Sequence, residues 1–199
     1  MPKDIEVSNF QKEFGGFEKL MPFRVRNILL AASLYDSFLL ADDENLNEAL
    51  FGDRDEGSAG LPAITRVPDA ESALARLEEG SFDLVISMLQ PSDADVGRFF
   101  SDIKKLCPGI SAVFLAFNMS EAANVPPEAR HLADGIFLWN GDTRIFSAII
   151  NVIEDARNFE RDSRSGVQAV LLVEDNVKFY SSYLPVIYNE LLKQARIVM

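Results

Sequence analysis

Five short apolar runs, separated by segments with helix-like spacing, constrain the fold of this chain more than any other feature. The runs are residues 27–33, 63–67, 82–89, 110–117 and 134–139. They are largely continuous in their apolar character, which is typical of strands covered on both faces of a sheet. The first helix-like segment, residues 34–51, follows the first run directly. We therefore predict an α/β domain over residues 24–162 with a doubly wound (βα)5 parallel sheet.

Capping residues and prolines indicate where several of the predicted helices begin and end. Asp69 has the position of an N-cap for the helix that follows it. Pro126 and Pro127 interrupt residues 120–133, so we expect a short or broken helix there. A long helix with one apolar stripe is predicted at residues 141–162.

The net charge of −12 and the pI of about 4.5 limit the partners of the chain. An acidic surface repels phosphate groups, so we expect no binding to nucleic acid or to an anionic membrane. No window of about 18 consecutive apolar residues predicts a transmembrane helix, and the N-terminus lacks the apolar stretch of a signal peptide. We therefore expect a cytoplasmic protein whose 199 residues hold one domain and part of a second.

Cys107 and His131 are the only residues of their kinds in the chain. One cysteine excludes an internal disulfide, and we expect Cys107 to be a buried structural thiol at a helix end. A metal site or a nucleophilic triad that needs histidine would depend on His131 alone. That residue lies in a predicted surface helix end, so we expect no functional role for it.

The first strand pattern recurs near the C-terminus. Residues 28–35 (ILLAASLY) align without a gap with residues 170–177 (VLLVEDNV), and aromatic and serine residues follow both segments. We predict an N-terminal arm at residues 1–23, a polar linker at 163–166 and the first β-α unit of a second domain at 167–199. This unit must lie on the first domain, pair with another chain, or belong to a longer polypeptide, and the last arrangement is favoured.

The runs FDLVISML before Pro91, ISAVFLAF and ADGIFLW, in this order, resemble the receiver domain of two-component response regulators, a flavodoxin-like fold. The resemblance covers residues 24–162 in full and residues 167–199 as a start. It implies an acidic pair after the first strand that binds Mg²⁺, and an aspartate ending the third strand that accepts a phosphoryl group. It also implies a hydroxyl residue ending the fourth strand and a lysine ending the fifth.

This sequence departs from the receiver pattern at each of those positions. A thioether cannot accept a phosphoryl group, and without carboxylates little remains to hold Mg²⁺. We therefore expect a pseudo-receiver with no catalytic residue, no metal and no cofactor, whose apolar site is filled and no longer switches. Trp139 is expected to pack in the core, with ligand stacking as the alternative. The five positions are Ala32 and Ser33 for the acidic pair, Met88 for the acceptor, Ala116 for the hydroxyl and Trp139 for the lysine.

Asp36, Asp93 and Asp95 lie near these positions in the sequence. They fall on predicted loops or helices rather than at the acceptor position, so we do not expect them to replace the missing aspartate.

The second copy of the pattern keeps an acidic pair, Glu174 and Asp175. The pair is a weak metal candidate alone, and Mg²⁺ would bind only at an intact second receiver. An apolar stripe follows it at helical spacing. We expect this stripe to be the core of a domain outside the chain, with a homodimer contact as the alternative. Its members are Tyr180, Leu184, Ile187, Tyr188, Leu191 and Leu192.

The phrases SLYDSF, FLWNGD and VEDNVKFYSSYLPVIYNELL also resemble the N-terminal region of large bacterial proteins of the pyruvate-phosphate-dikinase and phosphoenolpyruvate-synthase type. The favoured function is a non-catalytic regulatory or scaffolding module of a larger signalling or phosphotransfer protein, with protein partners and further domains. A phosphoacceptor working through the second receiver is the first alternative. A regulatory part of an ATP-dependent enzyme and a flavodoxin-like enzyme with its own cofactor are further ones. We expect no enzymatic activity from this chain itself, and leave that of a longer parent open.

Overall fold

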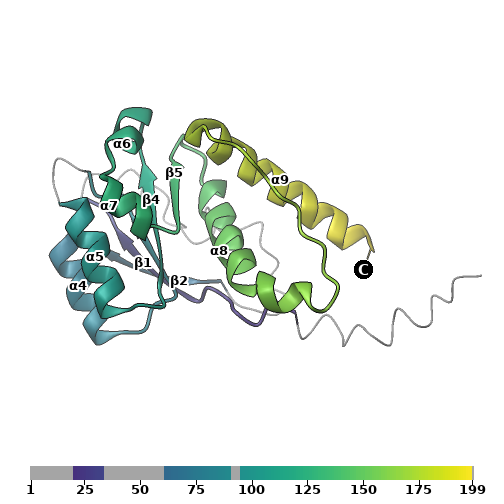
Figure 1. The fold of residues 1–199 in the computed structure, drawn as a ribbon, viewed down its shortest axis with the longest axis horizontal. Coiled ribbons are helices and arrows are strands. Elements are labelled where there is room, and N and C mark those ends of the chain that lie inside the picture. The colour runs from purple at the N-terminus through teal and green to yellow at the C-terminus, as the bar shows by residue number, and fades with distance from the viewer. Residues whose placement is uncertain (1–19, 34–60, 91–94, 199) are drawn as a thin grey trace, which may run out of the picture.

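A five-stranded parallel sheet forms the centre of the molecule (Figure 1). The computed structural model describes residues 20–33, 61–90 and 95–198. The strand order is β2-β1-β3-β4-β5, so the predicted parallel α/β sheet is confirmed. The strands are β1 (Asn27–Ala31), β2 (Ala63–Val67), β3 (Leu84–Ser87), β4 (Ser111–Ala116) and β5 (Gly135–Leu138).

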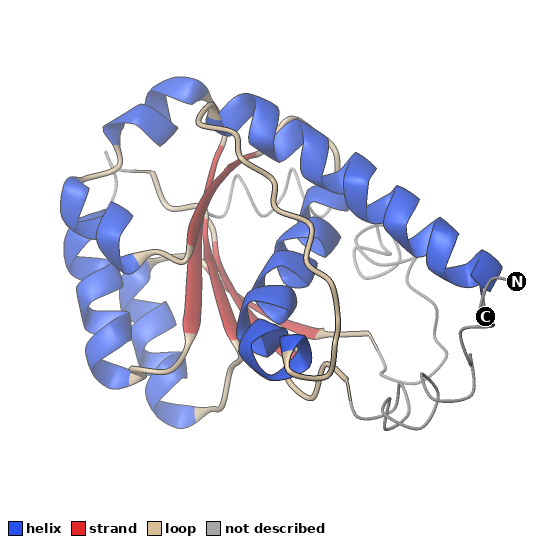
Figure 2. Ribbon diagram, turned by 45° about the vertical axis from the view of Figure 1, so that its right-hand side comes forward, coloured by secondary structure: helices blue, strands red, loops and turns tan. Residues whose placement is uncertain are grey.

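Helices cover both faces of the sheet (Figure 2). The side chains of β1 alternate between the two faces, and Leu29 and Leu30 are both 0% exposed. Leu30 packs with Phe146 and Ile149 of α8 on one face, and Leu29 packs with Phe100 of α5 on the other. The helices are α4 (Ala70–Glu79), α5 (Val96–Leu106), α6 (Met119–Asn124), α7 (Pro127–Leu132), α8 (Arg144–Ser163) and α9 (Val177–Val198).

The local signals in the sequence fix the helix ends as expected. The Asp69 carboxylate accepts a 2.7 Å hydrogen bond from the Ser72 backbone N–H and so caps α4. Asp95 caps α5 in the same way, with a 2.9 Å bond from the Arg98 N–H. The two prolines divide the segment after β4 into α6 and α7, with Pro127 as the first residue of α7. The helix predicted at residues 34–51 lies outside the described residues.

The C-terminal segment differs from its prediction. Residues 167–176 form no strand, and the exposed fractions of Val170, Leu171 and Val173 are 77%, 86% and 82%. A strand exists only where a neighbour pairs with its backbone groups, and none lies beside this segment in the described part of the chain. The predicted strand is therefore not formed in the chain as it folds here, whereas the helix predicted after it is present as α9.

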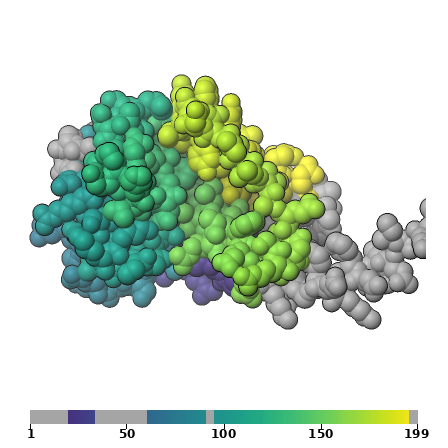
Figure 3. Space-filling view, viewed as in Figure 1, coloured from purple at the N-terminus to yellow at the C-terminus, as the bar shows by residue number. Residues whose placement is uncertain are grey.

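Helix α9 lies on the first domain, against β5 and α8 (Figures 1 and 3). Tyr180, Leu184 and Tyr188 of the apolar stripe pack on the same core cluster as α8. The expectation that this stripe is the core of a domain outside the chain is therefore wrong for these three residues. Leu191 and Leu192, further along the stripe, stay 46% and 44% exposed.

No helix in the described part of the chain combines the length and the apolar character needed to cross a lipid bilayer.

Candidate functional site

The five positions that the sequence analysis predicts to correspond to the receiver site meet at one edge of the sheet. Because all five strands are parallel, their carboxyl ends lie together, which is where open α/β sheets bind ligands. The Met88 N–H donates to the Ala31 carbonyl at 2.8 Å, and the Trp139 N–H donates to the Ala116 carbonyl at 2.7 Å. The Ala32 N–H donates to the carbonyl that ends β2 at 3.0 Å. The backbone ladder therefore holds these residues at the ends of neighbouring strands.

The side chains at these five positions are buried or half-buried. Ala32 and Ala116 are 0% exposed and Met88 is 1% exposed, while Ser33 and Trp139 are half-buried. The Trp139 ring meets Phe146 of α8 edge-on, with ring centroids 5.6 Å apart. Packing against the core is the role that the sequence predicts for Trp139. None of the five side chains can carry a charge at neutral pH.

Ser87 is a feature of this edge that sequence reasoning missed. It ends β3 directly before Met88 and is fully buried, yet its hydroxyl is the one buried side-chain polar atom without a hydrogen-bond partner in the described part of the chain. An unsatisfied buried hydroxyl costs about 1–3 kcal/mol. A serine inside an otherwise apolar strand run was the only available signal in the sequence.

The acidic pair Glu174 and Asp175 lies just before α9. Both residues line a surface hollow of about 340 Å³ that they share with Arg130 and Tyr180. The Glu174 carboxylate accepts a 2.9 Å hydrogen bond from the Asn176 N–H, which closes a local turn. The described residues contain no group of three or more His, Cys, Asp or Glu side chains that could hold a metal ion. Two carboxylates beside an arginine do not fit Mg²⁺, which requires a near-octahedral set of oxygens.

The Arg130 side chain serves a structural role between α6 and α7. Its guanidinium donates to the carbonyls of Ala122 and Ala123, and its Nε donates to the Val125 carbonyl at 3.0 Å. The last carbonyls of α6 lack partners within the helix, so this side chain satisfies them. Arg130 therefore joins the two short helices across the proline break.

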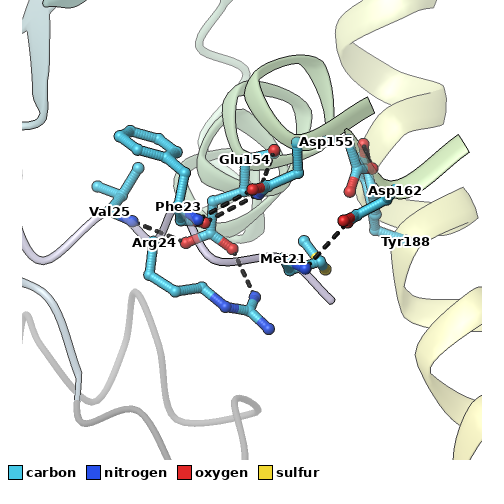
Figure 4. A network of polar contacts seen from close by, with 9 residues as sticks. Met21, Phe23, Arg24, Val25, Glu154, Asp155, Asp162 and Tyr188 are labelled. Carbon is cyan, nitrogen blue, oxygen red and sulfur yellow. Dashed lines mark hydrogen bonds and ion pairs between the residues drawn. The ribbon is translucent and has the colours of Figure 1, made fainter. Parts of the chain in front are cut away.

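A ladder of polar side chains on α8 binds the segment that leads into β1 (Figure 4). Four residues of a helix advance about 6 Å, and two residues of an extended chain advance about 6.6 Å, so the two spacings match. Three α8 side chains, spaced four residues apart, each accept one hydrogen bond from the segment. The donors are the backbone N–H groups of alternate residues. The pairs are Met21 with Asp162, Phe23 with Asn158, and Val25 with Glu154, each at 2.9 Å.

The three α8 side chains of the ladder are buried, and two of them make additional polar contacts with the segment before β1. Glu154 is 2% exposed, Asn158 3% and Asp162 6%. The Arg24 guanidinium lies 2.8 Å from the Glu154 carboxylate, and the Asn158 amide donates to the Phe23 carbonyl at 2.9 Å. Sequence reasoning missed this ladder, although three polar residues at a four-residue period inside an otherwise apolar helix pattern were a usable signal.

Helix α9 closes the free edge of the sheet at β5. β5 is the last strand of the sheet among the described residues, and its Leu138 N–H donates to the Ser181 hydroxyl at 2.8 Å. The Tyr180 ring stacks on Phe137 with centroids 6.0 Å apart. A helix over an edge strand prevents pairing with another strand there.

Cys107 and His131 take no part in these sites. Cys107 is half-buried rather than fully buried, because it lies at the end of α5 where the chain turns away from the core. His131 is exposed on α7, as expected. Asp36 and Asp93 lie outside the described residues, and Asp95 acts as the helix cap of α5.

No protein-family model matches the sequence, and no curated protein matches it. Several solved structures are similar to this chain. One belongs to a novel family of redox sensors in the streptococci that evolved from two-component response regulators. It aligns with 76% of this chain at 15% identity and a TM-score of 0.52. The alignment spans 58% of that protein's chain, so this chain covers less than two thirds of it.

Two response regulators also align. A LuxR family DNA-binding response regulator from Silicibacter pomeroyi covers 66% of this chain and 93% of its own, at 16% identity and a TM-score of 0.47. The response regulator TrrA from Thermotoga maritima, in complex with Mg²⁺ and BeF, covers 64% and 98%, at 17% identity and 0.45. The chain has the fold of a response-regulator receiver domain, as its strand order and the streptococcal structure show.

Proposed function

We propose that residues 24–162 form a regulatory or scaffolding module with a receiver fold that takes no phosphoryl group. The observation that carries this proposal is the set of uncharged side chains at the ends of the strands, with Ala32, Met88 and Ala116 at most 1% exposed. Phosphoryl transfer to a receiver needs a carboxylate nucleophile and oxygen ligands for Mg²⁺. Alanine and methionine side chains supply neither, so the fold is kept here without its reaction.

The packing at this edge supports a fixed rather than a switching module. Trp139 packs against Phe146, and Met88 joins the same core cluster. A well-packed core resists change because a shifted side chain loses contacts on every side. The module would therefore act through protein partners and further domains of a larger cytoplasmic protein.

Trp139 is the only tryptophan, so its fluorescence reports directly on the carboxyl edge. The test is a titration of the 199-residue chain with Mg²⁺, followed by beryllofluoride as a phosphoryl mimic. We expect no saturable change in intensity or wavelength. A saturable change with Mg²⁺ would contradict the proposal. The matched control is a phosphorylatable receiver with a tryptophan near its acceptor aspartate.

A second candidate is a phosphoacceptor that works through a second receiver. The sequence repeat favours it, because Glu174 and Asp175 occupy the positions of the acidic pair in the second copy. The acceptor aspartate would then lie in residues after Met199. If the parent resembles phosphoenolpyruvate synthase, its ATP chemistry would also lie outside these residues. Phosphopeptide mapping of the longer polypeptide separates this candidate from the first.

A further inference from the structure

Residues 168–175 are an extended segment whose backbone is unpaired. In the described part of the chain, none of their N–H or carbonyl groups forms a hydrogen bond to another backbone group. The segment touches the domain through Leu172, which packs against the core cluster of α8. An unpaired extended backbone is a template for strand pairing.

The exposed side chains of this segment are apolar on both sides. Neighbouring residues of an extended chain point in opposite directions, and Val170 and Leu171 are 77% and 86% exposed. The matching residues of β1, Ile28 and Leu29, are 1% and 0% exposed, because β1 pairs with strands on both sides and has helices on both faces. The same sequence pattern is fully buried in one copy and open in the other.

The apolar residues on both sides of this segment indicate what kind of sheet it would pair with. A strand that is apolar on both sides suits the interior of a parallel sheet covered by helices on both faces. Pairing with the same segment of a second copy would give a two-stranded ribbon, which cannot cover both faces.

Helix α9 presents a second apolar stripe beside the one that is buried. Ser181 and Leu184 face the first domain, whereas Phe179, Tyr183 and Val186 are 47%, 47% and 59% exposed. The exposed residues are four and three positions apart, so they share one side of the helix. The Phe179 and Tyr183 rings stack with centroids 6.1 Å apart. A surface helix in contact with a single domain needs only one apolar stripe.

We propose that residues 170–173 are an inner strand of a second parallel α/β sheet, formed with residues that follow Met199 in the same polypeptide, and that α9 is shared between the two domains. One stripe of α9 covers β5 and α8 of the first domain, and the other covers the second sheet. The second domain is thereby held against β5 through the Ser181–Leu138 contact and against α8 through the Tyr188–Asp155 contact. This inference goes beyond the proposed function and is independent of whether either domain takes a phosphoryl group.

The test compares amide hydrogen exchange in the natural full-length polypeptide and in residues 1–199. We expect the amides of residues 170–173 to exchange at least about 100-fold more slowly in the full-length protein, because pairing in a sheet interior protects them. The Leu138 amide, bonded to Ser181, should be protected in both proteins. Equal rates at residues 170–173 in the two proteins would overturn the proposal, as would a reading frame that encodes no further domain.

A pair of variants separates the partner sheet from a second copy of this chain. Leu171→Asp should leave the stability of residues 1–199 unchanged and abolish the protection of residues 170–173 in the full-length protein. Gln168→Asp, also at an exposed position, is the control and should change neither. If the amides of residues 170–173 in the 1–199 chain become protected as its concentration rises, together with dimer formation in sedimentation, a second copy is the partner and the proposal is wrong.

Discussion

The hydroxyl of Tyr188 on α9 donates a 2.7 Å hydrogen bond to the carboxylate of Asp155 on α8 (Figure 4). The bond joins two helices across 33 residues of sequence. Burial between the helices is the largest cause that raises the pKa of Asp155, and the nearby Glu154 and Asp162 carboxylates add to it. The Tyr188 hydrogen bond and Arg24 act in the opposite direction. The residue as a whole remains exposed, so water screens much of this effect.

The raised pKa of Asp155 predicts how its replacement responds to pH. Its stabilising contribution is fully present below the pKa of an unfolded aspartate, about 3.9, and is lost as the pH rises through the raised native pKa. Asp155→Asn removes this loss and keeps an oxygen to accept the Tyr188 hydrogen bond. The variant should therefore exceed the wild type in free energy of unfolding at pH 7 and not at pH 3. Urea unfolding at both pH values checks this, and a pH-independent difference would contradict it.

The polar ladder predicts a large loss of stability when its middle residue is truncated. Asn158→Ala leaves the N–H and the carbonyl of Phe23 without their partner, in a place where Asn158 is only 3% exposed. We expect the free energy of unfolding to fall by about 2–3 kcal/mol. Arg161→Ala, on the exposed side of the same helix, is the control and should change it by less than about 0.5 kcal/mol. Similar values for the two variants in urea unfolding would show that the ladder does not hold the segment.

The hydrogen bond from Leu138 of β5 to Ser181 predicts different effects for two adjacent serines of α9. Ser181→Ala leaves the Leu138 N–H unpaired in a buried place and should cost about 1–2 kcal/mol. The Ser182 hydroxyl bonds to the Lys178 carbonyl within its own helix, so Ser182→Ala should be nearly neutral. Exchange of the Leu138 amide gives a second readout, and it should accelerate only in the Ser181 variant. Unchanged exchange at Leu138 would mean that α9 does not cap this strand.

The unpaired hydroxyl of Ser87 predicts a stabilising substitution. Ser87→Ala removes a buried polar atom that has no partner in the described part of the chain. We expect thermal unfolding to show a gain of about 1 kcal/mol. Ser111→Ala, at another buried strand serine, is the comparison and should not stabilise the protein. A destabilised Ser87 variant would indicate that the hydroxyl has a partner.

Sequence reasoning reached the sheet and the positions at its carboxyl edge because both depend on local pattern. Continuous apolar runs specify buried strands, and the ends of parallel strands must meet. The strand predicted at residues 170–173 is not formed within residues 1–199, because a strand needs a pairing partner as well as a suitable sequence. Sequence reasoning also misplaced Tyr180, Leu184 and Tyr188, since an apolar stripe shows that a helix is covered but does not identify the surface that covers it.

The most direct test of the account is the intact mass of the 199-residue chain after incubation with Mg²⁺ and acetyl phosphate. A phosphorylatable receiver treated in parallel serves as the positive control. We predict that the mass stays unchanged, because the proposed function assigns the acceptor position to Met88, which is 1% exposed and has no carboxylate. Addition of one phosphoryl group to an aspartate within residues 24–162, located by peptide mapping, would contradict the account.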